Sequence, residues 1–209
     1  ISNDLPKRTL LWRIVQDHVN KNLFFLATEF GVYTSLNGCK NWQKLNGTPN
    51  MGFRDLVIQK RESDLVAASF GRGFYVLDDY SPLRNFSDEN LKKKGHLFPI
   101  KDGKWFIQRS NLGNTGADFY LAENPKYGVT MTYHLGNNYE TKSEKRKKSE
   151  KRLNQNLLDV PFPGYNNLDE EKNETPAYIK ISIEDQEGNI VRHLKERAAE
   201  GTHRITWDL

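Results

Sequence analysis

The sequence predicts an all-β chain in two parts, and three observations support this fold class. Residues 12–35 align without a gap with residues 54–77, and both copies contain short apolar runs separated by polar turns. Segments after residue 126 alternate apolar and polar side chains, which is the pattern of half-buried strands. Hydrophobic residues make up 36% of the 209 residues and aromatic residues 11%, which is enough to form a core.

The internal repeat has an offset of 42 residues and predicts blades of a β-propeller. A period of about 40–45 residues that contains several short strands is typical of such blades. Two blades cannot bury both of their faces alone. Residues 1–83 are therefore predicted to be the C-terminal blades of a larger propeller, with its remaining blades as their partners. The identical pairs are Val15 with Val57, Leu23 with Leu65, Gly31 with Gly73, and Tyr33 with Tyr75.

The first copy predicts four strands and the second copy predicts three. The first four lie at 11–15, 23–28, 31–35 and 42–45, and the next three lie at 54–59, 64–69 and 73–77. The run LFFLAT (23–28) is almost continuously apolar, so we expect both of its faces to be buried. Pro82 cannot donate a ladder hydrogen bond, so the second copy is expected to end without a fourth strand of its own.

The stretch TSLNGCKNW (34–42) lies where the first copy needs a hairpin turn. It approximates Ser-x-Asp-x-Gly-x-Thr-Trp, the Asp-box turn of sialidase-like and sortilin-like propellers, with Ser35 and Trp42 at the right separation. Asn37 can replace Asp because both side chains bond to backbone two residues on. Cys39 stands at the glycine position. We interpret Ser35, Asn37 and Trp42 as a degenerate structural Asp-box; the alternative is a chance spacing.

The C-terminal part predicts a β-sandwich of immunoglobulin-like type over residues 96–209, after a linker at 84–95. Short alternating strands separated by turns are typical of that fold. Its strands are expected at 96–100, 127–135, 177–185, 190–194 and 202–209. A Lys-rich insertion at about 140–175 interrupts them, and we expect its segment 142–156 to be either a solvated helix or disordered.

The chain also resembles the C-terminal part of bacterial sortilin-like propeller proteins with BNR (Asp-box) repeats, which are often labelled glycosyl-hydrolase-like. The resemblance is carried by LFFLATEFGVYTS (23–35), the run 54–84 that ends in GRGFYVLDDYSPLR, HLFPI (96–100), NPKYGVTMTYHL (124–135) and HRITWDL (203–209). It implies an extracytoplasmic protein, periplasmic, cell-surface or secreted, that binds or scaffolds at the cell envelope. A protein or glycan ligand would fit this role.

Four residues are candidates for ligand binding, because they occupy the same inter-strand loop in the two copies: Glu29, Phe30, Phe70 and Arg72. Arg72 lies between two glycines, so an anionic group could approach its guanidinium without steric hindrance. The alternative is a structural arginine that bonds to neighbouring carbonyls or to an acid such as Glu29.

No catalytic or phosphate-binding motif is present, and the five histidines are scattered, so we expect no catalytic residue, metal or cofactor in this segment. The net charge of +4 comes largely from TKSEKRKKSEKR (141–152), which has no interleaved aromatic residue, so we expect no nucleic-acid partner. No run of 18 apolar residues predicts a transmembrane segment. Two functions stay open: a non-catalytic binding segment, or part of a sialidase-like or glucanase-like glycoside hydrolase whose catalytic residues lie in other blades.

Overall fold

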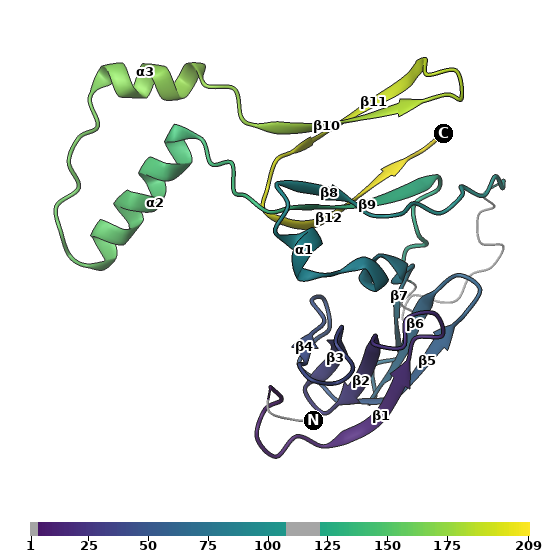
Figure 1. Cartoon of the computed structure of the whole chain (residues 1–209). Coiled ribbons are helices and arrows are strands. Elements are labelled where there is room, and N and C mark those ends of the chain that lie inside the picture. Colours follow the sequence, from purple (N-terminus) through teal and green to yellow (C-terminus); the bar gives the residue numbers. More distant parts are fainter. Residues whose placement is uncertain (1–3, 108–121) are drawn as a thin grey trace, which may run out of the picture. The chain divides into compact units, whose positions relative to one another are not determined.

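The computed structural model describes residues 4–107 and 122–209, which form two compact units (Figure 1). The first unit holds residues 4–90 and 122–126, and the second holds residues 91–107 and 127–209. The chain passes from the first unit to the second after Asn90, inside the predicted linker. Strands arranged in small antiparallel sheets dominate both units and helices are few, so the chain is mostly β, in agreement with the predicted class.

The first sheet is a four-stranded antiparallel meander. Its strands are β1 (Leu11–Gln16), β2 (Phe24–Thr28), β3 (Gly31–Ser35) and β4 (Gln43–Lys44), and they pair in that order. The last strand is short and pairs only through its two residues with Tyr33 and Thr34. The four predicted strands are thus present in the predicted order.

The second sheet repeats the first three strands. It consists of β5 (Phe53–Gln59), β6 (Asp64–Ser69) and β7 (Phe74–Leu77), again paired in sequence order. No fourth strand joins β7 among the residues that the structure describes. The chain instead enters the 3₁₀ helix η1 (Ser81–Asn85), with the buried Pro82 in its first turn, and then the short helix α1 (Asp88–Leu91). The expected ending of the second copy is therefore confirmed.

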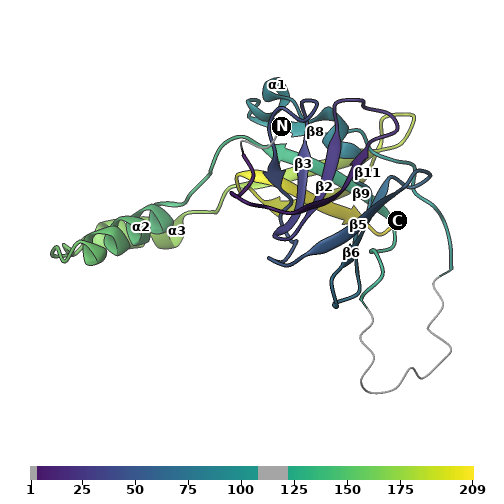
Figure 2. The ribbon, with the colours of Figure 1, turned by 90° about the horizontal axis from the view of Figure 1, so that it is seen from below.

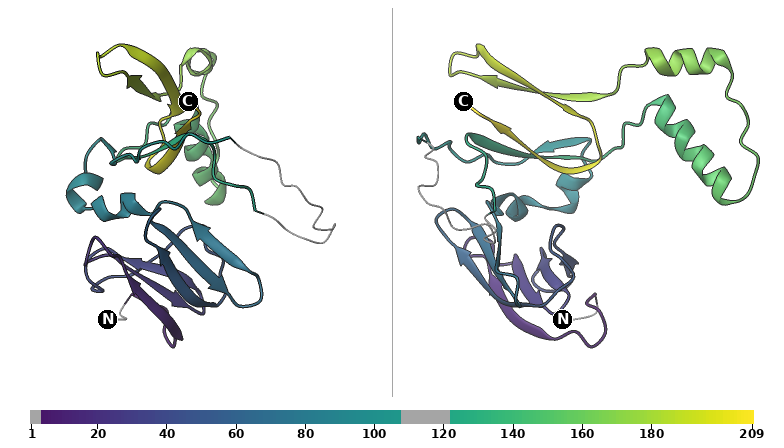
Figure 3. Two further views of the ribbon diagram at one scale, coloured as in Figure 1. Left: turned by 90° about the vertical axis from the view of Figure 1, so that its right-hand side faces the viewer. Right: turned by 180° about the vertical axis from the view of Figure 1, so that it is seen from behind.

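The two sheets of the first unit face each other across a shared apolar core (Figure 3). Residues at alternate positions of β2 point to opposite sides, as the pleat requires. Phe25 and Ala27 enter the shared core, whereas Leu26 packs on the other face with Tyr33 and Trp42. β2 is thus buried on both faces, as its apolar run predicts. The shared core consists of Leu23, Phe25, Ala27 and Val32 from one side, Phe53, Leu56, Leu65 and Ala67 from the other, and Tyr80.

The second unit contains one three-stranded and one two-stranded antiparallel sheet. The first pairs β12 (Gly201–Trp207), β9 (Val129–Leu135) and β8 (Gly95–Leu97), and the second pairs β10 (Tyr178–Glu184) with β11 (Ile190–Arg197). All five predicted strands are present. The core between the sheets is small; it contains Tyr133, Leu135 and Ala198, with Ile179, Ile181 and Ile205 packed against it.

The Lys-rich insertion forms two helices. The first covers almost all of residues 142–156, so the solvated-helix alternative is correct for that segment. These are α2 (Lys142–Gln155) and α3 (Tyr165–Asn173), and neither contains a buried residue. A capping box begins α2, because the Thr141 side chain accepts from the Glu144 amide while the Glu144 carboxylate accepts from the Thr141 amide. The two helices lie beside each other (Figure 2).

Ion pairs dominate the contact between α2 and α3. Arg146 donates to both carboxylate oxygens of Glu171, at 2.7 and 2.9 Å, and also to Glu150 at 2.6 Å. Lys142 donates to Glu170 at 2.6 Å. Glu171 has a lowered pKa, first because of the hydrogen bond from Arg146. Charge pairing, rather than apolar burial, therefore holds this pair of helices together.

Candidate functional site

The turn between β2 and β3 carries two of the four candidate binding residues, Glu29 and Phe30. It is closed by the buried Thr28, whose hydroxyl donates to the Gly31 carbonyl at 2.9 Å and accepts from the Phe30 amide at 3.1 Å. Glu29 accepts a hydrogen bond from the Leu10 amide at 3.0 Å through Oε1. One oxygen of Glu29 therefore holds the chain that enters β1, and the residue is part of the scaffold of this turn.

The turn between β6 and β7 carries the other two, Phe70 and Arg72. The Gly73 carbonyl accepts from both the amide and the hydroxyl of Ser69, at 3.0 and 2.7 Å. Gly71 and Gly73 have φ angles of +81° and +74°, which side chains rarely adopt, and an added Cβ would meet open space at both. Arg72 is exposed between them and makes no hydrogen bond or ion pair with the described part of the chain.

Both turns emerge at the same edge of the first unit. The first residue of β1, Leu11, pairs with Thr28 at the β2–β3 turn, and its neighbour Trp12 packs against Gly52, which precedes β5. The Phe70 amide donates to the Gly52 carbonyl at 2.8 Å, which brings the β6–β7 turn to the same place. The structure therefore gathers the four candidate residues on one edge.

A stack of two aromatic rings and an arginine lies on this edge and was not predicted. The Arg54 guanidinium lies over the Trp12 ring at 4.3 Å and over the Phe70 ring at 5.0 Å. Cation–π contacts of this kind fix the guanidinium and the rings relative to one another. A signal was available in the sequence, because Trp12 and Arg54 occupy equivalent positions in the repeat, 42 residues apart.

The turn 34–42 lies at the opposite edge. Side chains within the turn stabilise it through hydrogen bonds to its own backbone and to each other. Ser35 Oγ accepts from the Cys39 amide at 3.0 Å and donates to Asn37 Oδ1 at 3.1 Å. Asn37 Oδ1 also accepts from the Asn41 amide at 2.9 Å. Trp42 is buried next to Leu26 in the outer cluster of the first sheet. Ser35 and Asn37 thus stabilise this turn through hydrogen bonds, and Trp42 stabilises it through packing.

Cys39 adopts a backbone conformation that is unusual for a residue with a side chain. Its φ angle is +66°, in the left-handed region that glycine occupies readily and other residues rarely. Asp4 holds the end of the turn, because its Oδ2 accepts from the Trp42 amide at 3.2 Å and from the Asn41 side chain at 3.0 Å. Burial raises the pKa of the Cys39 thiol, so the residue is not a reactive thiolate.

A buried charge cluster lies at the same edge as this turn, and sequence reasoning missed it. The Asp17 side chain is fully buried and receives two hydrogen bonds from Arg84, at 2.8 and 2.9 Å, and one from the Tyr80 hydroxyl at 2.6 Å. Arg84 also donates to Ser63 Oγ at 3.0 Å. The imidazole of His18 lies 3.4 Å from Asp17. The cluster ties the segment after β7 to the loop after β1.

The ionisation of this cluster is set by its internal hydrogen bonds. Burial by itself would raise the pKa of Asp17, but the hydrogen bonds from Arg84, from the Asn20 amide and from Tyr80 lower it well below the usual range. Burial, and then the Asp17 carboxylate, raise the pKa of Tyr80. Asp17 is therefore ionised and Tyr80 neutral at physiological pH, and neither is poised to exchange a proton. We interpret the cluster as architecture rather than catalysis.

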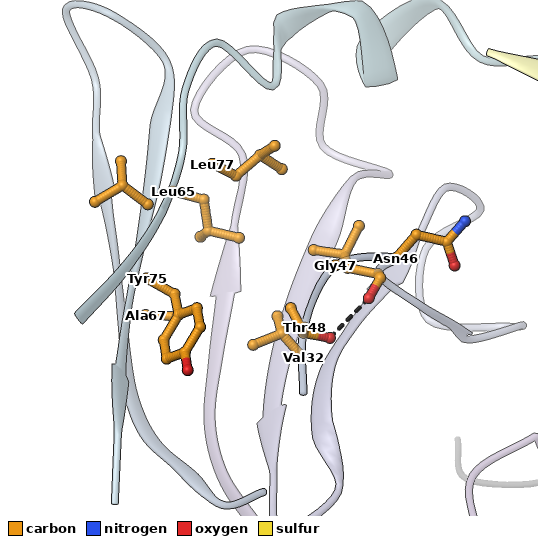
Figure 4. A pocket seen from close by; sticks show the side chains of 10 residues that line it. Val32, Asn46, Gly47, Thr48, Leu65, Ala67, Tyr75 and Leu77 are labelled. Atoms are coloured by element: carbon orange, nitrogen blue, oxygen red, sulfur yellow. Dashed lines mark hydrogen bonds between the residues drawn. The ribbon is translucent and has the colours of Figure 1, made fainter. Parts of the chain in front are cut away.

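A cavity of about 170 Å³ lies between the two sheets of the first unit (Figure 4). Its wall is mainly apolar; it is lined by Val32, Leu45, Gly47 and Thr48 on one side and by Leu65, Ala67, Tyr75 and Leu77 on the other. Small-molecule sites usually measure about 300–1,000 Å³ and contain convergent polar groups. The Thr48 hydroxyl is already bonded to the Leu45 carbonyl at 2.7 Å. This cavity is therefore a packing gap between sheets.

Within the described residues no group of three or more His, Cys, Asp or Glu side chains could hold a metal ion. Asp79 accepts from both the amide and the hydroxyl of Ser81 through the same oxygen, at 3.2 and 2.6 Å. It therefore stabilises the start of η1.

None of the helices in the described ranges is long and apolar enough to cross a membrane.

Comparison with known proteins places the chain in no established group. No family model, no curated protein and no solved structure matches its sequence or its fold.

Proposed function

We propose that the first unit is a pair of adjacent blades of a larger β-propeller of sortilin-like type, and that the chain is a non-catalytic binding or scaffolding segment at the cell envelope. The ligand, a protein or an anionic glycan, would contact the edge that carries Arg72. The second unit would be an immunoglobulin-like support for the propeller. The observation that carries this proposal is the contact between equivalent positions of the two sheets.

Two contacts join residues that are 42 positions apart, which is the offset of the repeat. Arg54 stacks on Trp12, and Asp55 pairs with Arg13 at 3.4 Å. All four residues lie on β1 and β5, the first strand of each sheet. Neighbouring blades related by a constant rotation bring equivalent positions of their innermost strands together, so these contacts favour blade-like stacking of the sheets.

An apolar row on the outer face of the second sheet supports the same reading. Val57, Val66 and Val76 are direct partners across β5, β6 and β7. Val57 and Val76 are more than half exposed, as is Phe74. A blade inside a ring buries both faces, so a further blade of the propeller would cover this row.

Arg72 supplies the binding chemistry in this proposal. Its guanidinium is exposed, uncommitted to any described partner, and flanked by glycines that leave its surroundings open. A carboxylate, sulfate or phosphate could accept two parallel hydrogen bonds from it. Phe30 and the Arg54 stack lie on the same edge and would contact less polar parts of a ligand.

Binding to an array of sialylated, sulfated and uronic-acid glycans tests the proposed edge. We expect Arg72→Ala to weaken a bound anionic glycan about ten- to a hundredfold, because a hydrogen bond to a charged group contributes roughly 1.5–3 kcal/mol. Arg61→Ala is the matched control, since Arg61 is exposed in the turn at the other end of β5. Equal weakening by both variants, or none by Arg72→Ala, would contradict the role of this edge.

The alternative function is part of a glycoside hydrolase whose acids lie in blades outside this chain. Hydrolysis would need two carboxyl groups that flank a common cleft. Asp17 and Asp79 are engaged in structural hydrogen bonds, as described above, so we do not assign either of them this role. Turnover of sialosides or β-glucans by this chain, abolished by one acidic-to-Ala substitution, would establish the alternative.

A further inference from the structure

The cations of α2 are sorted onto two opposite faces of the helix. Successive residues of an α-helix are rotated by about 100°. Lys142, Arg146 and Glu150 therefore share one face, and this is the face that makes the ion pairs described above, two of them with α3. The opposite arc, about 160° wide by the same rotation, carries five exposed cations: Lys145, Lys147, Lys148, Lys151 and Arg152.

This outer face also contains one acid, Glu144, whose carboxylate accepts from the Thr141 amide and pairs with Arg197 of β11. Its five cations outnumber this acid, so the face keeps a net positive charge. Among its five cations, only Lys148 forms an ion pair with a described residue, Glu140, at 3.1 Å. The acids of α3 that contact α2 are Glu170 and Glu171, and both are used by Lys142 and Arg146. The pair of helices thus separates its charge, with a cationic surface on the side of α2 that faces away from α3.

The segment 156–164, which connects α2 to α3, ends this cationic surface with exposed apolar side chains. Leu157 is 94% exposed and Phe162 63%, and Leu158 is also exposed; Tyr165, the first residue of α3, is 78% exposed. The rings of Phe162 and Tyr165 lie edge to face, 5.1 Å apart. In Figures 1 and 2 the segment lies at the end of the helix pair that is remote from the strands of the second unit. Solvating so many apolar side chains on one loop is unfavourable unless another surface covers them.

We propose that α2, the 156–164 segment and α3 form an arm that docks on an anionic lipid bilayer surface. The cationic face of α2 would lie along the lipid headgroups, and Leu157, Leu158 and Phe162 would enter the boundary between headgroups and acyl chains. Stable attachment to a membrane takes two signals, and a cluster of four to eight cations beside a short apolar insertion supplies both. This inference is independent of the function proposed for the first unit.

The distribution of side chains favours a lipid surface over other anionic partners. Single-stranded nucleic acid is bound by aromatic side chains interleaved with the cations, whereas the aromatic residues of the arm lie beyond the end of α2. An acidic protein would pair with the cations, but charge pairing alone would leave the exposed apolar side chains of the segment 156–164 (the apolar tip of the arm) uncovered. A bilayer uses both, because its charge lies at the surface and its apolar phase begins just beneath.

Co-sedimentation of the whole chain with lipid vesicles tests this proposal. We compare vesicles of phosphatidylcholine alone with vesicles that also contain phosphatidylserine. We expect binding only to the anionic vesicles, and we expect Lys145→Gln/Lys147→Gln/Lys151→Gln to weaken it about a hundredfold, since each cation near the surface contributes roughly fivefold. Leu157→Ser/Phe162→Ser should weaken it at least about tenfold, because less apolar surface is inserted.

The matched control changes three exposed lysines of the first unit, Lys21→Gln/Lys40→Gln/Lys60→Gln, and should leave vesicle binding unchanged. Circular dichroism of each variant verifies that its secondary structure is retained. Failure of the chain to bind anionic vesicles at low salt would overturn the proposal. Equal losses in the arm and control variants would also overturn it. Binding to soluble polyphosphate that is as tight as binding to vesicles, and insensitive to the tip substitutions, would instead identify a soluble polyanion as the partner.

Discussion

At the scale of single residues, Asp17 and Arg84 form a largely buried ion pair with two hydrogen bonds in the first unit. Neither could be predicted, because 67 positions separate them and no local pattern links an acid after β1 with an arginine after β7. Trp12 and Arg54 could have been found, since the repeat aligns them. Glu29 and Arg72 occupy equivalent loops of the repeat, but their roles differ in the structure. Glu29 accepts a hydrogen bond from a backbone amide, whereas Arg72 is exposed.

We predict that Asp17→Asn lowers the free energy of unfolding by roughly 3–5 kcal/mol, because it leaves the guanidinium of Arg84 without its buried partner. Chemical denaturation followed by fluorescence measures this change. Asp55→Asn is the control, since its ion pair with Arg13 is 57% exposed on both sides and should contribute under about 1 kcal/mol. The pKa of Asp17 is lowered in the folded state. The stability that ionised Asp17 contributes is therefore present above its unfolded pKa near 3.8 and is lost progressively as the pH falls below that value. Equal effects of the two substitutions, or a stability that does not fall in acid, would contradict this account.

At the scale of elements, the positions of the strands could be predicted from the sequence, whereas the elements that pack against each other could be predicted only in part. Period-two alternation and turn residues locate strands because the pleat sends successive side chains to opposite faces. The same reasoning left the Lys-rich insertion undecided, since its helices have no apolar face. Their stability comes from Arg146 and Lys142 paired with acids that lie 25 and 28 positions away, which a local pattern does not reveal.

We predict that salt loosens this arm selectively. Ion pairs near the surface are screened within about 8–10 Å at 0.10–0.15 M salt and over shorter distances above that. Hydrogen exchange followed by mass spectrometry should therefore show faster exchange of α2 and α3 amides in 0.5 M sodium chloride, while amides of β2 and β6 keep their protection. Arg146→Ala should reproduce the effect of salt at low ionic strength. Unchanged exchange in both cases would mean that ion pairs do not hold the arm.

At the scale of the whole molecule, we propose that the first unit is two blades of a ring. The repeat offset of 42 predicts it from sequence, and the contacts of Arg54 with Trp12 and of Asp55 with Arg13 support it in space. Closure of a ring could not be derived from this chain, because a blade is completed by neighbours and the row Val57, Val66 and Val76 has no described cover. The function at the Arg72 edge depends on that ring, whereas docking of the arm does not.

Electron cryo-microscopy of the protein purified from its natural source is the most direct test of this claim. We predict a map in which the sheet β5–β6–β7 packs on another sheet through Val57, Val66 and Val76, and in which β1 and β5 lie nearest the centre of a closed ring of similar sheets. A map in which the two sheets of the first unit stand alone, with this valine row in solvent, would contradict the account.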